Sequence, residues 1–319
     1  MKLQHALRSL LLFATGFMLL NQAQAAAPMV KTQAPGYYRM MLGDIEVTAL
    51  LDGTVALNAK QLFTHTPAEK IDQALALAYD KEPVETSVNG FLVNTGNKLV
   101  LIDTGAGNLF GPTLGSLVAN LKAAGYQPEQ VDEIYITHMH PDHVGGLMAG
   151  DKLAFPNAIV RADKHDVDYW LDEANMAKVP PEAQRFFQGA ITSLKPYVDA
   201  GKLKAFEGDT DLVPGVRAIA RYGHTPGHTA YMIESRGEKM LAWGDLVHVS
   251  ALQFNDPNAV IRFDVDTKAG AAQRNVSYTE AAKQNYWIAA AHNSFPGIGH
   301  VKAVKKGYTW VSTNYKAIR

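Results

Sequence analysis

The sequence predicts an α/β protein with mixed sheets whose faces are covered by helices. Two observations support this fold class. Segments rich in apolar and β-branched residues alternate along the chain with segments of helical period. Several of the strand-like segments also follow one another with only short turns between them, which indicates antiparallel neighbours beside parallel ones.

The first 25 residues are set aside from the fold because they have the layout of a secretory signal. A basic start precedes an apolar run at 10–20, and Ala23 and Ala25 supply small residues at a cleavage spacing. The apolar run is too short to span a bilayer, although a buried helix or a membrane anchor is the alternative interpretation. We therefore predict a signal peptide at 1–25, a single hydrolase domain at 26–319, a periplasmic or secreted location, and no membrane contact after cleavage.

The first half of the mature chain contains three strand-like segments and one helix. Residues 45–51 and 91–102 are predicted strands, and the second forms a hairpin with its turn at 95–97. A helical period covers 114–124 and is closed by a glycine. Residues 133–137 form a short strand that leads directly into a histidine-rich segment.

The second half continues the alternation of helices and strands. Its predicted helices are 164–173, 181–199 and 268–285. Its predicted strands are 158–162, 203–206, 216–221, 229–235, 239–243, 286–291 and 307–312.

Composition narrows the chemistry that the chain can support. It contains no cysteine, so a metal site must use nitrogen and oxygen ligands. The net charge is −1, with Lys and Arg interspersed among Asp and Glu, and this balance does not favour a nucleic-acid partner.

The segment THMHPDHVGG, residues 137–146, holds three of the 11 histidines of the chain. Side chains two apart on an extended segment point the same way, so His138 and His140 can hold one ion. Asp142 and His143 follow a proline that suits a first helical turn, and they can face a second position nearby. The pattern should arise by chance at roughly one position in a million, which disfavours a merely solvated histidine-rich loop.

Other polar residues also follow predicted strands, namely Asp103, His224, Asp245 and His292. Strand ends that converge on one sheet edge are where α/β proteins place ligands and catalytic groups. As metal ligands we choose His224 and His292. We expect His228 to hydrogen-bond near the site, and we expect His300 to lie in a loop. A carboxylate such as Asp245 can bridge two cations, although a post-strand aspartate is commonly a turn residue or helix cap. Asp103 is expected to orient a ligand histidine.

Together, the segments THMHPDHVGG, GHTPGH, GDLVH, IDTG and AHNSFPGIGH make the sequence resemble the metallo-β-lactamase fold superfamily. Within it, the chain is most similar to methyl parathion hydrolase and related exported lactonases. The resemblance implies an αβ/βα four-layer sandwich, two divalent metal ions that are usually zinc, and a homodimer. It assigns His138, His140 and His224 to one metal, Asp142, His143 and His292 to the other, and Asp245 to a bridging position.

The same resemblance suggests which residues line the substrate cleft, although ordinary core packing is an equally good explanation for each aromatic one. These residues are Phe110, Trp170, Phe186, Phe187, His248, Ile261 and Phe263. His248 stands where organophosphate hydrolases are expected to have an apolar residue, and it could bind or protonate a leaving group or bound a smaller pocket.

We therefore predict a dinuclear hydrolase of small lactones or aryl esters. A metal-bridging hydroxide would attack the substrate, and Asp142 or Asp245 would accept a proton. The enzymatic alternative is an organophosphate triesterase. The non-enzymatic alternative is a metal-binding protein without catalysis.

Overall fold

A computed structural model describes residues 27–318 of the chain. The chain divides into two units, Met1–Ala34 and Pro35–Arg319, and every helix and strand of the described residues lies in the second. The predicted signal peptide, residues 1–25, lies outside the described residues. Within them, no helix is both long enough and apolar enough to cross a membrane.

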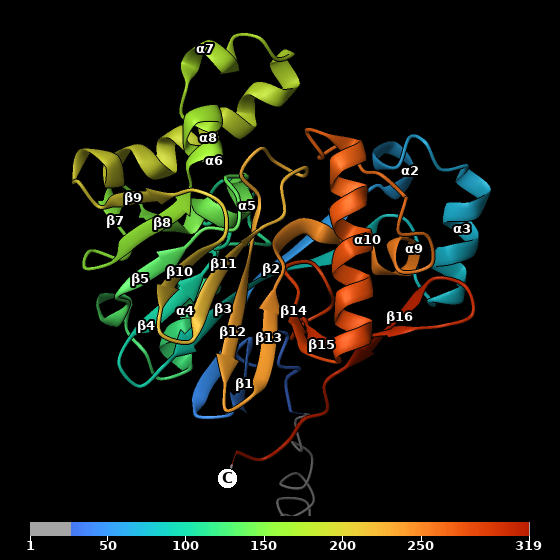
Figure 1. Ribbon diagram of the computed structural model, residues 1–319, viewed down its shortest axis with the longest axis horizontal. Helices are drawn as coiled ribbons and strands as arrows, with labels where there is room; N and C mark the ends of the chain where they lie inside the picture. Colours follow the sequence, from blue (N-terminus) through green and yellow to red (C-terminus); the bar gives the residue numbers. More distant parts are fainter. Residues whose placement is uncertain (1–26, 319) are drawn as a thin grey trace, which may run out of the picture. The chain divides into compact units, whose positions relative to one another are not determined.

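Two seven-stranded mixed sheets form the centre of the second unit (Figure 1). In the first sheet the strands lie in the order β1-β2-β3-β4-β5-β8-β9, antiparallel from β1 to β4 and parallel from β4 to β9. The strands of this sheet are β1 (Tyr37–Leu42), β2 (Ile45–Leu57), β3 (Val84–Asn94), β4 (Leu99–Ile102), β5 (Glu133–Tyr135), β8 (Ile159–Asp163) and β9 (Leu203–Phe206).

The second sheet runs in sequence order from β10 to β16, and only the pair β13–β14 is parallel. Its strands are β10 (Thr210–Val213), β11 (Val216–Ala220), β12 (Thr229–Ser235), β13 (Glu238–Ala242), β14 (Trp287–Ala289), β15 (Ile298–Ala303) and β16 (Tyr308–Ser312). A separate hairpin joins β6 (Met148–Ala149) to β7 (Lys152–Leu153).

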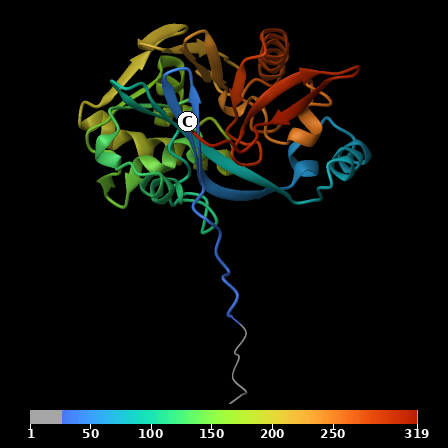
Figure 2. The same cartoon turned by 90° about the horizontal axis from the view of Figure 1, so that it is seen from below.

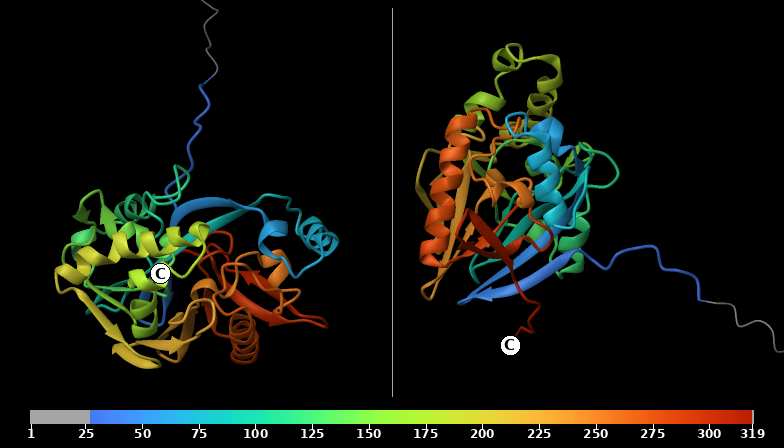
Figure 3. Two further views of the ribbon diagram at one scale, coloured as in Figure 1. Left: turned by 90° about the horizontal axis from the view of Figure 1, so that it is seen from above. Right: turned by 90° about the vertical axis from the view of Figure 1, so that its right-hand side faces the viewer.

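The two sheets pack face to face, with helices on the outer faces. Val47 and Phe91 of the first sheet share a buried core with Tyr231 and Met240 of the second. Outside the first sheet lie α4 (Leu117–Ala123), α6 (Lys164–Trp170) and α8 (Pro181–Asp199), whereas α10 (Thr267–Gln284) covers the second (Figure 3, right). The predicted α/β class and four-layer sandwich are therefore confirmed.

Short helices fill the connections between the layers. They are α2 (Ala59–Leu62), α3 (Ala68–Leu77), α5 (Pro141–Val144), α7 (Glu173–Met176) and α9 (Ser250–Gln253). Seen from below, β2 and β3 extend together towards α2 and α3 (Figure 2). The end of β2 thereby reaches the side of the molecule where the candidate site lies.

Several sequence-based boundaries differ from the structure. Strand β2 runs to Leu57 and not only to residue 51, and β3 begins at Val84 and not at residue 91. The predicted helix 164–173 is two helices, because the Asp172 side chain accepts a hydrogen bond from the backbone of Ala174 and caps a new helix. The helix predicted from residue 114 begins at Leu117. His300 lies in strand β15, so its placement in a loop was wrong. The edge strands β1 and β10, and also β15, escaped prediction because they are short or partly exposed.

Candidate metal centre

The carboxyl ends of five strands meet at one edge of the two sheets. Strands β4 and β5 are parallel in the first sheet, and β11, β13 and β14 run in one direction in the second. Asp103, His138, His224, Asp245 and His292 follow these strands in that order. The backbone N–H of Thr229 donates to the carbonyl of Thr137 at 2.8 Å and ties the two edges together. The sandwich therefore brings side chains from both sheets to one place.

One group of potential ligand atoms comes from both sheets. The Nε2 atom of His224 lies 3.2 Å from Nε2 of His138 and 3.1 Å from Nδ1 of His140. The Oδ2 atom of Asp245 lies 3.4 Å from Nε2 of His224 and 3.5 Å from Nε2 of His138. All four side chains are buried.

A second group lies on the other side of Asp245. Its Oδ1 atom is 3.1 Å from Nε2 of His143 and 3.1 Å from Nε2 of His292. The Oδ2 atom of Asp142 is 3.5 Å from each of these two nitrogens. Nε2 of His292 is also 3.2 Å from Oδ2 of Asp245. The carboxylate of Asp245 therefore stands between the two ligand groups and contacts both, as expected of a bridging carboxylate.

The two groups fit divalent cations by their chemistry and spacing. Two ligands at 2.0–2.1 Å from one tetrahedral zinc ion lie about 3.3 Å apart, close to the 3.1–3.2 Å between the ring nitrogens of the first group. Nε2 of His143 and Oδ1 of Asp245 are buried and form no hydrogen bond. Because buried polar atoms are normally satisfied, these atoms indicate that a cation belongs between them.

Hydrogen bonds direct the Nε2 atom of several histidines towards the site. The Nδ1–H of His143 donates to Asp103, that of His224 to Asp264, and that of His292 to the carbonyl of Ser87, at 2.8–2.9 Å. Each of these hydrogen bonds fixes a ring proton on Nδ1 and turns Nε2 towards the ligand group, where it can bind a cation that displaces any proton on it. Asp103 also accepts from the backbone and hydroxyl of Thr137, which places the carboxylate where the sequence analysis expected it.

His228 stands behind the bridging aspartate and not among the ligands. Its Nε2 accepts the backbone N–H of Asp245 at 3.0 Å, and its Nδ1–H donates to the carbonyl of Arg221 at 3.2 Å. Burial, reinforced by the neighbouring His224, lowers the pKa of His228 to about 3. The ring is therefore neutral, and its hydrogen bond holds the backbone that carries Asp245.

Two carboxylates that sequence reasoning missed hold the ligand loops. Asp166 accepts from the backbone N–H of Met139 at 3.0 Å, from the Thr225 hydroxyl at 2.9 Å and from the backbone N–H of Gly227 at 2.6 Å. It thereby joins the loop after β5 to the loop after β11. Asp264, the partner of His224, lies 40 residues along the chain from it. Asp166 lies in the first turn of α6, where an acidic residue is ordinary, and Asp264 belongs to no local motif, so the sequence did not single out either role.

The electrostatics of the metal-free site favour a cation. Burial would raise the pKa values of Asp142 and Asp245, but His143 and His292 hold both below the usual value. Burial, together with repulsion from neighbouring imidazolium groups, lowers the pKa of His138 well below its usual value, and His140 behaves in the same way. The metal-free site therefore presents two ionised carboxylates and a neutral His138 and His140. Burial lowers the pKa values of His143, His224 and His292, but nearby carboxylates outweigh burial and raise all three above the usual value, so a bound cation would take the place of protons on these rings.

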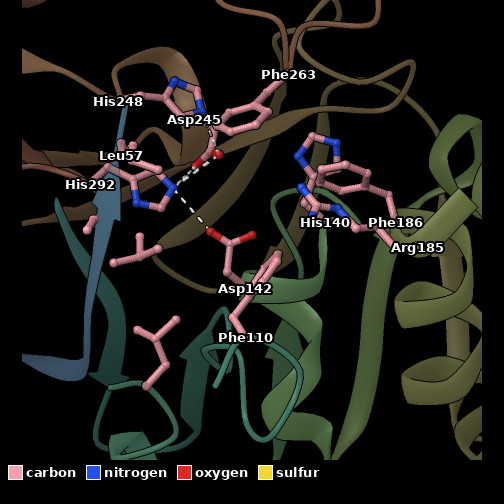
Figure 4. A pocket seen from close by; sticks show the side chains of 13 residues that line it. Leu57, Phe110, His140, Asp142, Arg185, Phe186, Asp245, His248, Phe263 and His292 are labelled. Carbon is pink, nitrogen blue, oxygen red and sulfur yellow. Dashed lines mark hydrogen bonds and ion pairs between the residues drawn. The ribbon is translucent and has the colours of Figure 1, made fainter. Parts of the chain in front are cut away.

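A cavity of about 250 Å³ opens onto the ligand groups (Figure 4). Its lining includes four of the predicted cleft residues, Phe110, Phe186, His248 and Phe263. His248 is buried, and its Nε2 lies 3.1 Å from Oδ2 of Asp245, so it also stands within reach of a ligand group.

Three predicted cleft residues do not line this cavity. Trp170 and Phe187 pack in the core between helices and the first sheet, and Ile261 packs against the α3 and α9 region. The placement of these three residues in the cleft is therefore corrected. The walls also contain residues that the sequence did not single out, namely Val55, Ala56, Leu57, Leu114 and Arg185. The three from β2 lie beyond the predicted strand 45–51, because β2 continues to Leu57. Arg185 is an exposed residue of α8, and nothing in the local sequence distinguishes it from other surface residues.

Comparisons with known proteins agree with this geometry. Residues 83–284 match the family model described as the metallo-beta-lactamase superfamily. The crystal structure of the hydrolase AbOPH in the beta lactamase superfamily is 40% identical, covers 90% of this chain and 100% of that chain, and has a TM-score of 0.85. The dizinc quorum-quenching lactonase AidC, solved with a product, is 26% identical over 88% of this chain and 99% of its own, with a TM-score of 0.82.

A curated relative is similar over a shorter stretch. The N-acyl homoserine lactonase of Bacillus cereus is 29% identical over 164 residues, which is 46% of this chain and 57% of that protein. The chain thus spans little more than half the length of this relative.

Proposed function

This chain belongs to the metallo-beta-lactamase superfamily, and from that membership we propose that it is a hydrolase that holds two divalent cations and cleaves small lactones or aryl esters. The observation that carries the proposal is the pair of ligand groups that share Asp245. AidC and the Bacillus cereus protein are named as lactonases, which supports lactones as the substrate class.

Seven side chains would hold the cations. His138, His140 and His224 would hold one, Asp142, His143 and His292 the other, and Asp245 would contact both. When bound, divalent cations polarise the substrate carbonyl and lower the pKa of water. Zinc is our proposed metal because AidC is described as a dizinc enzyme, although nitrogen and oxygen ligands also suit other divalent ions.

Asp142 is the carboxylate that we assign to proton transfer. Its side chain is 17% exposed and lines the cavity, whereas that of Asp245 is 3% exposed and lies between imidazoles. Its lowered pKa keeps it ionised at neutral pH. Asp142 can therefore accept a proton from the attacking water and release it to the leaving oxygen, while Asp245 stays in place.

His248 is assigned to the substrate. Burial lowers its pKa to about 4, so the imidazole is neutral at pH 7. A neutral ring at the cavity wall can hydrogen-bond a carbonyl or leaving-group oxygen without adding charge. The bulk of the ring also narrows the cavity, whose volume lies below the 300–1,000 Å³ typical of sites for drug-sized ligands and favours small substrates.

The test combines metal analysis with a substrate screen. Purified protein should contain about two divalent cations per chain, and it should hydrolyse lactones or aryl esters faster than a paraoxon-type phosphotriester. A chelator should remove the metal and the activity together. Faster phosphotriester turnover would instead favour the triesterase alternative, and metal binding without any hydrolysis would favour the non-catalytic one.

Export by residues 1–25 and a homodimer are two further proposals. N-terminal sequencing of the exported protein tests the first, and light scattering tests the second.

A further inference from the structure

Arg185 is a permanently charged side chain in the wall of the cavity that holds the ligand groups. It lies on α8, next to Phe186 (Figure 4). The other basic side chains of the lining are the histidines of the site, and the walls beside them are aliphatic or aromatic, including Val55, Leu57 and Leu114.

Arg185 forms no ion pair or side-chain hydrogen bond with any residue that the structure describes. Most other arginines of residues 27–318 are paired: for example, Arg217 pairs with Asp211 at 2.8 Å, and Arg221 pairs with Glu280 at 2.8 Å. Arg185 is exposed, and its donors are free to bind a group that enters the cavity.

Aromatic contacts place Arg185 close to the chemistry. Its guanidinium carbon lies 5.1 Å from the centre of the Phe186 ring. The same ring lies 5.0 Å from the ring of His140, a proposed ligand, and 6.3 Å from that of Phe263 on the other wall. The guanidinium thus stands one aromatic ring away from the first ligand group, within cation–π distance of Phe186.

We propose that Arg185 binds a carboxylate of the substrate, so that the enzyme prefers lactones or esters that carry an anionic group away from the reacting carbonyl. A guanidinium matches a carboxylate with two parallel hydrogen bonds, and the aliphatic wall offers the anion no competing partner. This inference rests on the proposed hydrolase function and names the class of substrate for the same site.

Two matched substrate pairs test the proposal. 4-Nitrophenyl glutarate and 4-nitrophenyl pentanoate have the same acyl length and differ in a terminal carboxylate. 3-Carboxyphenyl butyrate and phenyl butyrate share the acyl group and differ in a carboxylate on the phenol leaving group. In at least one pair, wild-type protein should prefer the anionic ester by about tenfold in kcat/KM, the scale of one charge-assisted contact. The preference should shrink as salt is added, because Arg185 is exposed.

Arg185→Gln should bring this ratio close to one, and Arg185→Glu should bring it below one. Arg262→Gln is the matched control, since Arg262 is also exposed and without an ion pair among the described residues, lies next to Phe263, and does not line the cavity. The control should keep the wild-type ratio. A ratio near one in wild type for both pairs, or a ratio that Arg185→Gln leaves unchanged, overturns the proposal.

A binding measurement separates this proposal from the proposed function. Glutarate and pentanoate each offer one carboxylate to the metal centre, but only glutarate has a second one for Arg185. Metal-loaded wild-type protein should bind glutarate about tenfold more tightly, and Arg185→Gln should remove the difference. If no ester is hydrolysed but the difference is present, the hydrolase function fails and the anion site stands. Equal affinities in wild type reject the anion site whatever the enzyme hydrolyses.

Discussion

His228 and His248 are both buried histidines in contact with Asp245, yet they contact different parts of it. His228 accepts the backbone N–H of Asp245, whereas His248 meets the carboxylate from the cavity side. Substitution of the two residues should therefore have different consequences. Loss of His228 frees the backbone that carries the bridging carboxylate, and loss of His248 changes what the substrate touches.

Substitution of single histidines should separate metal ligands from cavity residues. His138→Ala removes a ligand and should lower kcat/KM more than about 100-fold for every substrate, with less metal bound per chain. His248→Leu should instead change the ratio of lactone to aryl ester turnover by about tenfold. His300→Ala, in β15 and outside the site, is the control and should keep wild-type rates. An equal loss for all substrates in His248→Leu would make His248 catalytic.

Metal binding should release protons in a pH-dependent way. Burial lowers the pKa of His224, but Asp245 and Asp264 outweigh burial and raise it to about 9 in the metal-free site. At pH 7.5 zinc must therefore displace a proton from this ring, and affinity should rise with pH up to about 9. Calorimetric titration in buffers of different ionisation enthalpy should detect at least one proton released per chain. If zinc binding released no proton at pH 7.5, the raised pKa of His224 in the metal-free site would be contradicted.

At the scale of elements, α6 connects the two ligand loops through a single side chain. Asp166 lies in its first turn and hydrogen-bonds to backbone groups on both loops. Burial raises its pKa to about 6, against the lowering effect of these hydrogen bonds, so the carboxylate is the main form at pH 7.5. The spacing between the His138–His140 segment and His224 therefore depends on a helix that contributes no ligand.

Asp166→Asn should weaken metal binding and the fold together. An amide nitrogen cannot accept the N–H groups that the carboxylate accepts, so at least one buried donor is left without a partner. We expect a loss of about 1–3 kcal/mol in the free energy of unfolding and about 10- to 100-fold in zinc affinity at pH 7.5. Asp168→Asn, on the same helix but exposed and paired with Lys164, should change neither quantity appreciably. Similar effects from both variants would reject the role of Asp166.

At the scale of the whole molecule, the proposed ligands come from both sheets. His138, His140 and His143 follow β5 of the first sheet, whereas His224, Asp245 and His292 follow strands of the second. Cations bound here would hold the two sheet edges together. Metal binding should therefore contribute to the stability of the sandwich, in addition to any role in catalysis.

Chelation should lower the melting temperature. At free zinc about 1,000 times its dissociation constant, binding contributes about 4 kcal/mol to stability, which corresponds to roughly 10 °C for a chain of this size. Scanning fluorimetry with EDTA, followed by re-addition of zinc, measures the change and its reversal. A melting temperature that stays constant while the metal content falls to zero would show that the site does not link the sheets.

The sequence by itself determined the fold class, the family and the ligand candidates, because these depend on local patterns. The His138–His143 cluster lies on one continuous segment, and His224, Asp245 and His292 each follow a recognisable strand. Local periodicity also predicted most strands, but it missed short or exposed ones such as β1 and β15.

Only the tertiary structure decided how the site is held and bounded. Asp166 and Asp264 act through hydrogen bonds to residues about 27 to 61 positions away, and such pairings leave no local pattern. An apolar or aromatic residue in the sequence indicates burial but not what it is buried against, which is why Trp170, Phe187 and Ile261 pack in the core while Leu57 and Leu114 line the cavity. Arg185 shows the same limit for charge: its side chain becomes a candidate substrate contact only because α8 lies beside the sheet edge that carries the ligands.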